Sequence, residues 1–317
     1  MKKLLYISII CFLFLSSCSR KSSSETVRLG VLKGPTGIGM AHLIEGSNQN
    51  KTRGNYSVTI SSLPDEIALG FLKGELDIVS VPVNMASILY NKSSHNAKLL
   101  AVNTVDAIYL LAPDGMKISG ISDLKDKRII AQGKGVMPDI LLTSLLEKEG
   151  LGYVSSNIEW KSEAVEVIKD AVSSNNAVVM LPEPFASLLL TRDPKYRILF
   201  SLSDEWKKAG FSDNVVISVV IANKEYAASH KKEIQNFLYD LKSSVKIVQN
   251  DPSLTARVVD KLDIAKEDVI KNALVRIGAV AITGGDAKKL LLPFYDVLFK
   301  ASPRFIGGSA PMEDFYE

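Results

Sequence analysis

The stretch Gly30-Val31-Leu32-Lys33-Gly34-Pro35-Thr36-Gly37-Ile38-Gly39-Met40 decides how this chain folds. It starts within an apolar segment, which predicts a strand over Val27 to Leu32, and continues into a loop with three glycines and one proline. Apolar residues at helical spacing follow the loop. Glycine lets a backbone approach a guest closely, and the first amides of a helix have no internal partner. The loop is therefore a candidate ligand cradle, formed by Pro35, Thr36, Gly37, Ile38 and Gly39.

Two common nucleotide motifs do not fit this loop. A P-loop requires Lys followed by Ser or Thr after its last glycine, whereas Met40-Ala41 stand here. A dinucleotide fingerprint would place its third glycine where His42 stands. An ordinary strand-to-helix turn with no ligand role remains open as an alternative.

The N-terminus has the pattern of a secretion signal. Two lysines precede a short apolar run, Leu4 to Leu15, and small residues follow, which predicts a signal peptide over residues 1–17. Leu15-Ser16-Ser17-Cys18 also resembles the bacterial lipobox. That resemblance implies cleavage before Cys18 and attachment of lipid to it, with a Ser-rich tether over residues 18–26. The alternative is a signal anchor with an incidental cysteine.

Composition excludes several function classes. Cys11 and Cys18 are the only cysteines, so a chain cleaved before Cys18 has no disulfide within it and no cysteine metal site. Loss of two lysines with the signal lowers the formal charge from +3 to +1, which gives no bulk attraction for nucleic acid. The three histidines lack metal-ligand spacing, and no Gly-x-Ser-x-Gly elbow is present. We therefore expect no metal, no cofactor and no catalytic residue.

Strands and helices alternate along the chain, which indicates an α/β fold with mostly parallel sheets. Residues 62–89 also match residues 162–189 when shifted by 100 positions, with Pro82 falling on Pro182 and Ser87 on Ser187. Each segment follows its own glycine-rich loop, which predicts two similar α/β lobes. A long apolar strand over Asn214 to Ala222 and three helices complete the prediction, over Lys231 to Asn250, Lys266 to Ile277 and Asp286 to Ala301.

Ligands of parallel sheets bind beyond the carboxyl ends of the strands. By this rule the further candidates, beyond the opening loop, are Pro64, Asp65, Val83, Asn84, Gly133, Lys134, Gly135, Val136, Met137 and Glu183. Lys134 could neutralise an anion and Glu183 could hold an amine. The carboxylates of Asp65 and Glu183 could equally cap their own helices. The candidates come from both lobes and carry little reactive chemistry, which favours binding over turnover.

The whole mature chain resembles the substrate-binding lipoproteins of bacterial ABC importers, in the NitT/TauT family that covers nitrate, sulfonate, taurine and thiamine-precursor binding. The resemblance rests on five segments. They are the lipobox at Cys18, Gly34-Pro35-Thr36-Gly37, Gly74-Glu75-Leu76-Asp77-Ile78, Ile121-Ser122-Asp123-Leu124-Lys125 and Leu181-Pro182-Glu183-Pro184-Phe185-Ala186.

This resemblance implies a type II periplasmic-binding-protein fold, with two lobes joined by two crossover strands. The crossovers would be Ile108 to Ala112 and Asn214 to Ala222, which makes lobe 1 discontinuous (27–110 and 215–317) and leaves 111–214 as lobe 2. It also implies a small-molecule ligand between the lobes, permease and ATPase partners, and a monomer held on the outer face of a membrane by its lipid. One branch of the family makes the thiamine pyrimidine enzymatically with a cysteine-rich motif, which this mature chain lacks. A solute sensor remains a third possibility.

Overall fold

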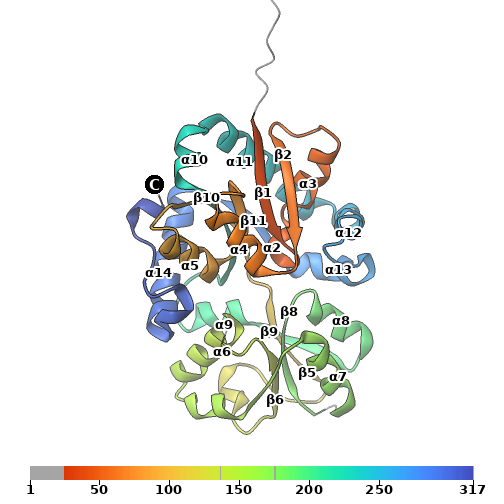
Figure 1. The fold of residues 1–317 in the computed structure, drawn as a ribbon. Coiled ribbons are helices and arrows are strands. Elements are labelled where there is room, and N and C mark those ends of the chain that lie inside the picture. The colour runs from red at the N-terminus through yellow and green to blue at the C-terminus, as the bar shows by residue number, and fades with distance from the viewer. Residues whose placement is uncertain (1–24, 136, 175, 317) are drawn as a thin grey trace, which may run out of the picture.

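The structure is a computed structural model that describes residues 25–135, 137–174 and 176–316. The predicted signal peptide, Cys18, most of the tether and the candidate site residue Val136 lie outside the described residues. Figure 1 shows two α/β bodies, one above the other, with the described chain beginning at the far end of the upper body. We call the upper body lobe 1 and the lower body lobe 2.

Lobe 1 is built on a six-stranded sheet in the order β11-β4-β10-β3-β1-β2. Its strands are β1 (Thr26–Leu32), β2 (Asn55–Ser61), β3 (Ile78–Pro82), β4 (Ala97–Val105), β10 (Val216–Asn223) and β11 (Gly278–Ile282). Its helices are α2 (Pro35–Ile38), α3 (Ala41–Asn48), α4 (Pro64–Leu72), α5 (Val83–Lys92), α10 (Lys224–Ser229), α11 (Lys231–Asn250), α12 (Pro252–Lys261), α13 (Glu267–Ala273) and α14 (Gly284–Ala301). The central strand β3 is apolar along most of its length because both faces of the sheet are covered.

Lobe 2 is built on a five-stranded sheet in the order β7-β6-β8-β5-β9. Its strands are β5 (Ile108–Pro113), β6 (Ile129–Gln132), β7 (Ile158–Lys161), β8 (Val178–Pro182) and β9 (Tyr196–Ser201). Its helices are α6 (Met137–Lys148), α7 (Ala164–Ser174), α8 (Phe185–Arg192) and α9 (Leu202–Lys208).

The two lobes repeat one topology, as the sequence echo predicts. In lobe 1, β1 pairs in parallel with β2 and β3, and β10 pairs antiparallel with β3. In lobe 2, β6 pairs in parallel with β7 and β8, and β5 pairs antiparallel with β8. β3 and β8 are offset by 100 residues, and each ends on a proline from which the next helix follows.

Two short crossings connect the lobes. The first runs from β4 to β5 through Asp106 and Ala107, whose φ angles are 49° and 153°. The second leads from α9 back to β10. The crossings contact one another, because the amide of Asp106 donates to the carbonyl of Val215 (2.8 Å) and the Asp106 carboxylate accepts from Asn214 Nδ2 (3.1 Å). The chain passes from one lobe to the other at 106–107 and at 214–215. The two segments expected as crossovers, Ile108 to Ala112 and most of Asn214 to Ala222, are strands that lie beside these crossings.

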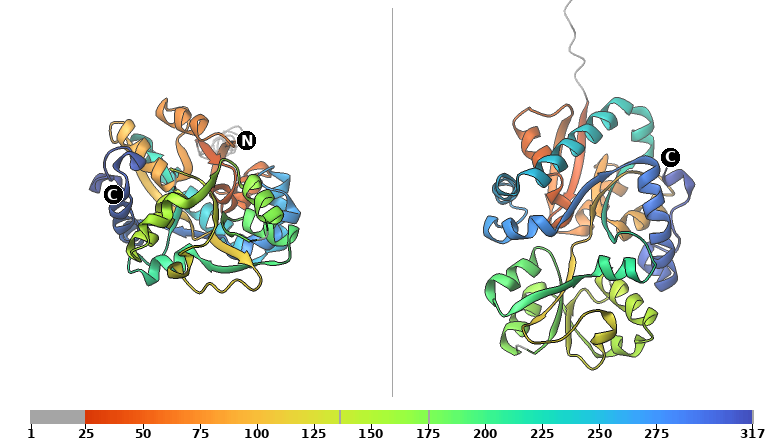
Figure 2. Two further views of the ribbon diagram at one scale, coloured as in Figure 1. Left: turned by 90° about the horizontal axis from the view of Figure 1, so that it is seen from below. Right: turned by 180° about the vertical axis from the view of Figure 1, so that it is seen from behind.

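Helix α14 forms a second contact between the lobes. It belongs to the C-terminal part of the chain but reaches down beside lobe 2 in both views from the side (Figures 1 and 2). The ring of Phe294 on α14 meets the ring of Trp206 on α9 edge to face, with 6.1 Å between centroids, and both side chains are fully buried. The lobes therefore share apolar core on this side.

Several elements differ from the sequence-based prediction. The loop expected over Pro35 to Gly39 is mostly the short helix α2, and the sequence does not predict β9, β11, α9, α10 or α12. The helix expected over Lys266 to Ile277 ends at Ala273, and a 3-10 turn, Leu274–Arg276, leads from it into β11. β9 and β11 are edge strands that pair with one neighbour each. Their apolar runs are too short to separate strand from helix by periodicity, and pairing with β5 and β4 decides the outcome.

Candidate functional site

A cavity of about 530 Å³ lies where the two lobes meet. Pro35, Pro64, Asp65 and Asn84 line it from lobe 1, and Met137, Pro138 and Pro182 line it from lobe 2. Ala107, Ile108 and Ile217, beside the crossings, form its back. The volume is within the usual range for small-molecule sites, and most of the lining is apolar.

Strand direction explains why these residues meet. β2 and β3 run parallel to β1, so their carboxyl ends share one edge of the sheet, and Pro64 and Pro82 lie at that edge. Pro182 ends β8 at the corresponding edge of lobe 2. Proline suits the first turn of a helix because it needs no amide partner there. The repeated strand-proline-helix unit thus places one proline turn from each lobe on opposite sides of the cavity.

The turn at Pro35 is fixed from behind by buried polar side chains. Asn103 Nδ2 donates to the carbonyl of Thr36 (3.0 Å), and Ser80 Oγ donates to the same oxygen (3.1 Å). Thr104 Oγ1 donates to the carbonyl of Pro35 (3.1 Å). Asn103 and Ser80 are completely buried, so these bonds exclude water and set the height of the turn above the sheet.

Five of the residues predicted from the sequence line the cavity: Pro35, Pro64, Asp65, Asn84 and Met137. Thr36, Gly37, Ile38, Gly39 and Val83 lie behind it, buried in lobe 1. The Thr36 hydroxyl makes no hydrogen bond to a described residue, and its residue is 6% exposed.

The second glycine loop lies outside the cavity lining. Gly133 is partly exposed, and Lys134 and Gly135 are exposed. The amide of Gly135 donates to Asp139 Oδ2 (2.8 Å), so this backbone donor is already used by the following helix. No described side chain forms an ion pair with Lys134.

Glu183 is fully buried next to the cavity and forms an ion pair across the lobes. Its carboxylate accepts from the amide and the hydroxyl of Ser187, at 3.0 Å each, which is the capping role that the sequence left open. It also pairs with Arg276 Nε at 2.5 Å. Arg276 belongs to the 3-10 turn after α13, and its carbonyl accepts from the hydroxyl of Tyr109 on β5 (2.8 Å). Burial, and then the charge of Glu183, raises the pKa of Tyr109 to about 12, which keeps that hydroxyl a donor.

Sequence reasoning missed Arg276 and most of the apolar lining. Helical spacing could have revealed part of the lining, since Ala68 and Leu72 lie four and eight residues after Pro64 on one face of α4. No local pattern identifies Arg276, because it lies 93 residues from Glu183 in the chain.

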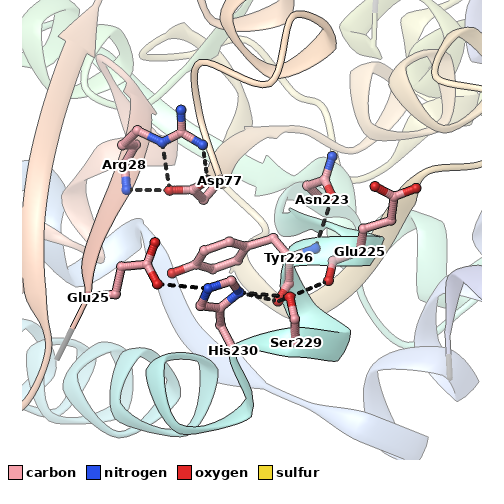
Figure 3. A network of polar contacts seen from close by, with 8 residues as sticks. All are labelled: Glu25, Arg28, Asp77, Asn223, Glu225, Tyr226, Ser229 and His230. Atoms are coloured by element: carbon pink, nitrogen blue, oxygen red, sulfur yellow. Dashed lines mark hydrogen bonds and ion pairs between the residues drawn. The ribbon is translucent and has the colours of Figure 1, made fainter. Parts of the chain in front are cut away.

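A second polar cluster lies where the described chain begins (Figure 3). Arg28 donates through its amide (2.8 Å) and Nε (2.9 Å) to Asp77, and His230 Nε2 contacts Glu25 at 2.8 Å. The ring of Tyr226 stacks on His230, with 4.1 Å between centroids. The buried Tyr226 hydroxyl has no hydrogen-bond partner among the described residues, whereas the charged groups pair with one another. The cluster therefore fastens the start of β1 to β3 and to the turn between α10 and α11.

Within residues 25–135, 137–174 and 176–316, no helix is long and apolar enough to cross a membrane. These residues also contain no group of three or more His, Cys, Asp or Glu side chains placed to hold a metal ion.

The fold occurs in solved structures of transporter binding proteins. An ABC transporter from Parabacteroides distasonis is similar at a TM-score of 0.77 and 21% identity, over 92% of this chain and 98% of that one. The periplasmic aliphatic sulphonate binding protein SsuA from Escherichia coli gives 0.68 and 17%, over 91% and 93%. The periplasmic nitrate-binding protein NrtA from Synechocystis PCC 6803 gives 0.56 and 10%, over 78% and 69%.

The sequence matches no protein-family model and no curated protein. At these identities the structural similarity shows a shared fold. The predicted fold class is therefore confirmed, with two α/β lobes joined by two crossings that lead into β5 and β10, as in periplasmic binding proteins.

Proposed function

We propose that this protein is the extracytoplasmic solute-binding component of an ABC-type importer. The observation that carries the proposal is the cavity between two lobes of one topology, joined by two short crossings. Such a fold suits capture of a guest by rigid-body movement of the lobes. The similar structures include an ABC transporter and binding proteins for sulfonate and nitrate, which supports the same proposal.

The proposed ligand contacts are the predicted residues that line the cavity: Pro35, Pro64, Asp65, Asn84 and Met137. We divide the chain into lobes at the crossings, 106–107 and 214–215. The first lies a few residues before the boundary that the resemblance implies, and the second coincides with it. The proposed partners are a permease and its ATPase, which would receive the ligand from a monomeric receptor.

A thermal-shift panel tests the proposal. Purified mature protein is melted with nitrate, small sulfonates, amino acids, thiamine precursors and short apolar amides. A ligand that binds only the folded state raises the midpoint, and a saturating ligand should also reduce the radius of gyration measured by small-angle X-ray scattering. A stabilising ligand whose affinity is unchanged when Asn84 is replaced by Ala and when Pro35 is replaced by Gly would contradict binding in this cavity.

We also propose that Cys18 carries a lipid that holds the protein on the outer face of a membrane. The lipobox spacing supports this, and the described chain begins at the end of lobe 1 that lies away from lobe 2 (Figure 1). Cys18→Ser should move the protein from the membrane fraction to the soluble fraction. Cys11→Ser, within the predicted signal, is the matched control and should leave fractionation unchanged. Retention of the Cys18→Ser protein in the membrane fraction would refute the anchor.

A further inference from the structure

The cavity extends beyond the meeting point of the lobes, between two helices of lobe 1. Pro64, Asp65, Ala68 and Leu72 line it from α4. Asn84, Met85, Ile88, Leu89 and Lys92 line it from α5. Both sets follow the helical repeat, so each helix turns one face to the same space. We call this part of the cavity the α4–α5 groove.

The neighbouring side of α5 is already occupied. Ser87 Oγ donates to the carbonyl of Ile306 (2.8 Å), and Asn91 Nδ2 donates to the carbonyls of Ile306 (3.1 Å) and Ser309 (2.8 Å). The C-terminal segment therefore covers that side, whereas the face with Met85 and Ile88 borders open space. Both side chains are partly exposed, and the groove is continuous with the space between the lobes.

The groove is elongated. Asn84 and Lys92 are eight residues apart on α5, which corresponds to about 12 Å along a helix axis. Between Asn84 and Lys92, the side chains of α4 and α5 that line the groove present only carbon atoms and the sulfur of Met85. A compact oxyanion would fill little of this length.

The polar groups stand at the two ends of the groove. At the lobe junction, Asn84 Nδ2 makes one long hydrogen bond to the carbonyl of Phe305 (3.5 Å), and Asn84 Oδ1 accepts from no described residue. The charged groups, Asp65 and Lys92, are exposed and opposite in sign. Within the described ranges, the nearby cation Arg276 is already paired with Glu183. An ion held between the lobes would thus lack a buried counter-charge, which is costly.

We infer that the ligand of this protein is an elongated, largely apolar, uncharged molecule with one hydrogen-bonding head group. The head lies at Asn84 in the junction of the lobes, and the apolar chain lies in the α4–α5 groove toward Leu72. This inference rests on the proposed solute-binding function and specifies its ligand class. An amide head suits Asn84, because each amide can donate to and accept from the other.

A chain-length series tests the inference on the purified mature protein. Calorimetric titration with n-alkanamides from butyramide to octanamide should show affinity rising about fourfold for each added methylene that the groove covers. Nitrate and methanesulfonate should bind more weakly than octanamide. Octanoate, which has the same chain and a charged head, should also bind more weakly.

Two matched variants locate the chain. Ala68 lines the groove, whereas Leu69 is 54% exposed and does not line it. Ala68→Phe should fill the groove and remove the chain-length dependence, and Leu69→Phe should leave it intact. Leu72→Ser, at a 37% exposed position on the groove wall, is a milder variant should Ala68→Phe fold poorly.

The outcomes separate the ligand class from the function. A flat chain-length series, or a series unchanged in both Ala68→Phe and Leu72→Ser, overturns the inference. Tight binding of nitrate or methanesulfonate in place of the amides also overturns it but leaves the solute-binding function standing. If no compound in this series or in the thermal-shift panel binds, both the ligand class and the proposed function fail.

Discussion

The ion pair between Glu183 and Arg276 should hold the two lobes together, and its removal can be predicted in detail. Glu183 is fully buried, while the Arg276 side chain is 25% exposed. Arg276→Met keeps most of the apolar stem but leaves the carboxylate without a counter-ion. The bond from Arg276 Nη2 to the Ser187 hydroxyl (2.5 Å) is lost as well. The carboxylate still accepts hydrogen bonds from the Ser187 amide and hydroxyl, so the loss should be smaller than for an entirely unpaired buried charge.

The size of the effect follows from these contacts. A hydrogen bond to a charged group contributes about 1.5–3 kcal/mol, and breaking a fully buried ion pair costs about 3–5 kcal/mol. Because Arg276 retains some solvent contact, we expect the lower range, about 1.5–3 kcal/mol. This corresponds to a shift of roughly 10- to 150-fold in the equilibrium between joined and separated lobes.

Two measurements test this reasoning. Small-angle scattering of the unliganded protein should show a larger radius of gyration for Arg276→Met than for wild type, and urea unfolding should show lower stability. Arg304→Met is the matched control, because Arg304 is exposed and forms no ion pair with a described residue. Glu183→Gln combined with Arg276→Met should cost less than the sum of the two single changes, since the double variant leaves no charge unpaired. A strictly additive cycle, or an unchanged radius of gyration in Arg276→Met, would refute the role of the pair.

Two further predictions concern the opening turn and the partly buried His42. A Cβ at Gly37 would lie 2.8 Å from the carbonyl oxygen of Leu32, whereas one at Gly39 would meet its nearest atom at 3.5 Å. Gly37→Ala should therefore lower the free energy of unfolding by about 1–3 kcal/mol while Gly39→Ala is tolerated, and equal urea midpoints would contradict this. Burial lowers the pKa of His42 below 6.5, so unfolding takes up a proton below that pH and stability falls as the pH drops from about 7.5 to about 5. His42→Gln should flatten this part of the stability profile, and an identical slope in the variant would be inconsistent with the assignment.

The sequence by itself determined the local units and their repetition. Glycine, proline and apolar spacing act within a few residues, so the first strand and the strand-proline units ending at Pro82 and Pro182 could be predicted without a structure. The same reasoning located Pro35, Pro64 and Asn84, because the carboxyl ends of parallel strands share one edge.

Only the tertiary structure decided which of these groups face the cavity and which are already bonded. Glu183 pairs with Arg276, a residue 93 positions away, and the turn at Thr36 is held by Asn103, 67 positions away. The edge strands β9 and β11 are equally non-local, since pairing with β5 and β4 selects strand over other conformations of short apolar segments. The physical reason is that burial and long-range hydrogen bonds depend on how the lobes pack, whereas turn chemistry and periodicity act along the chain.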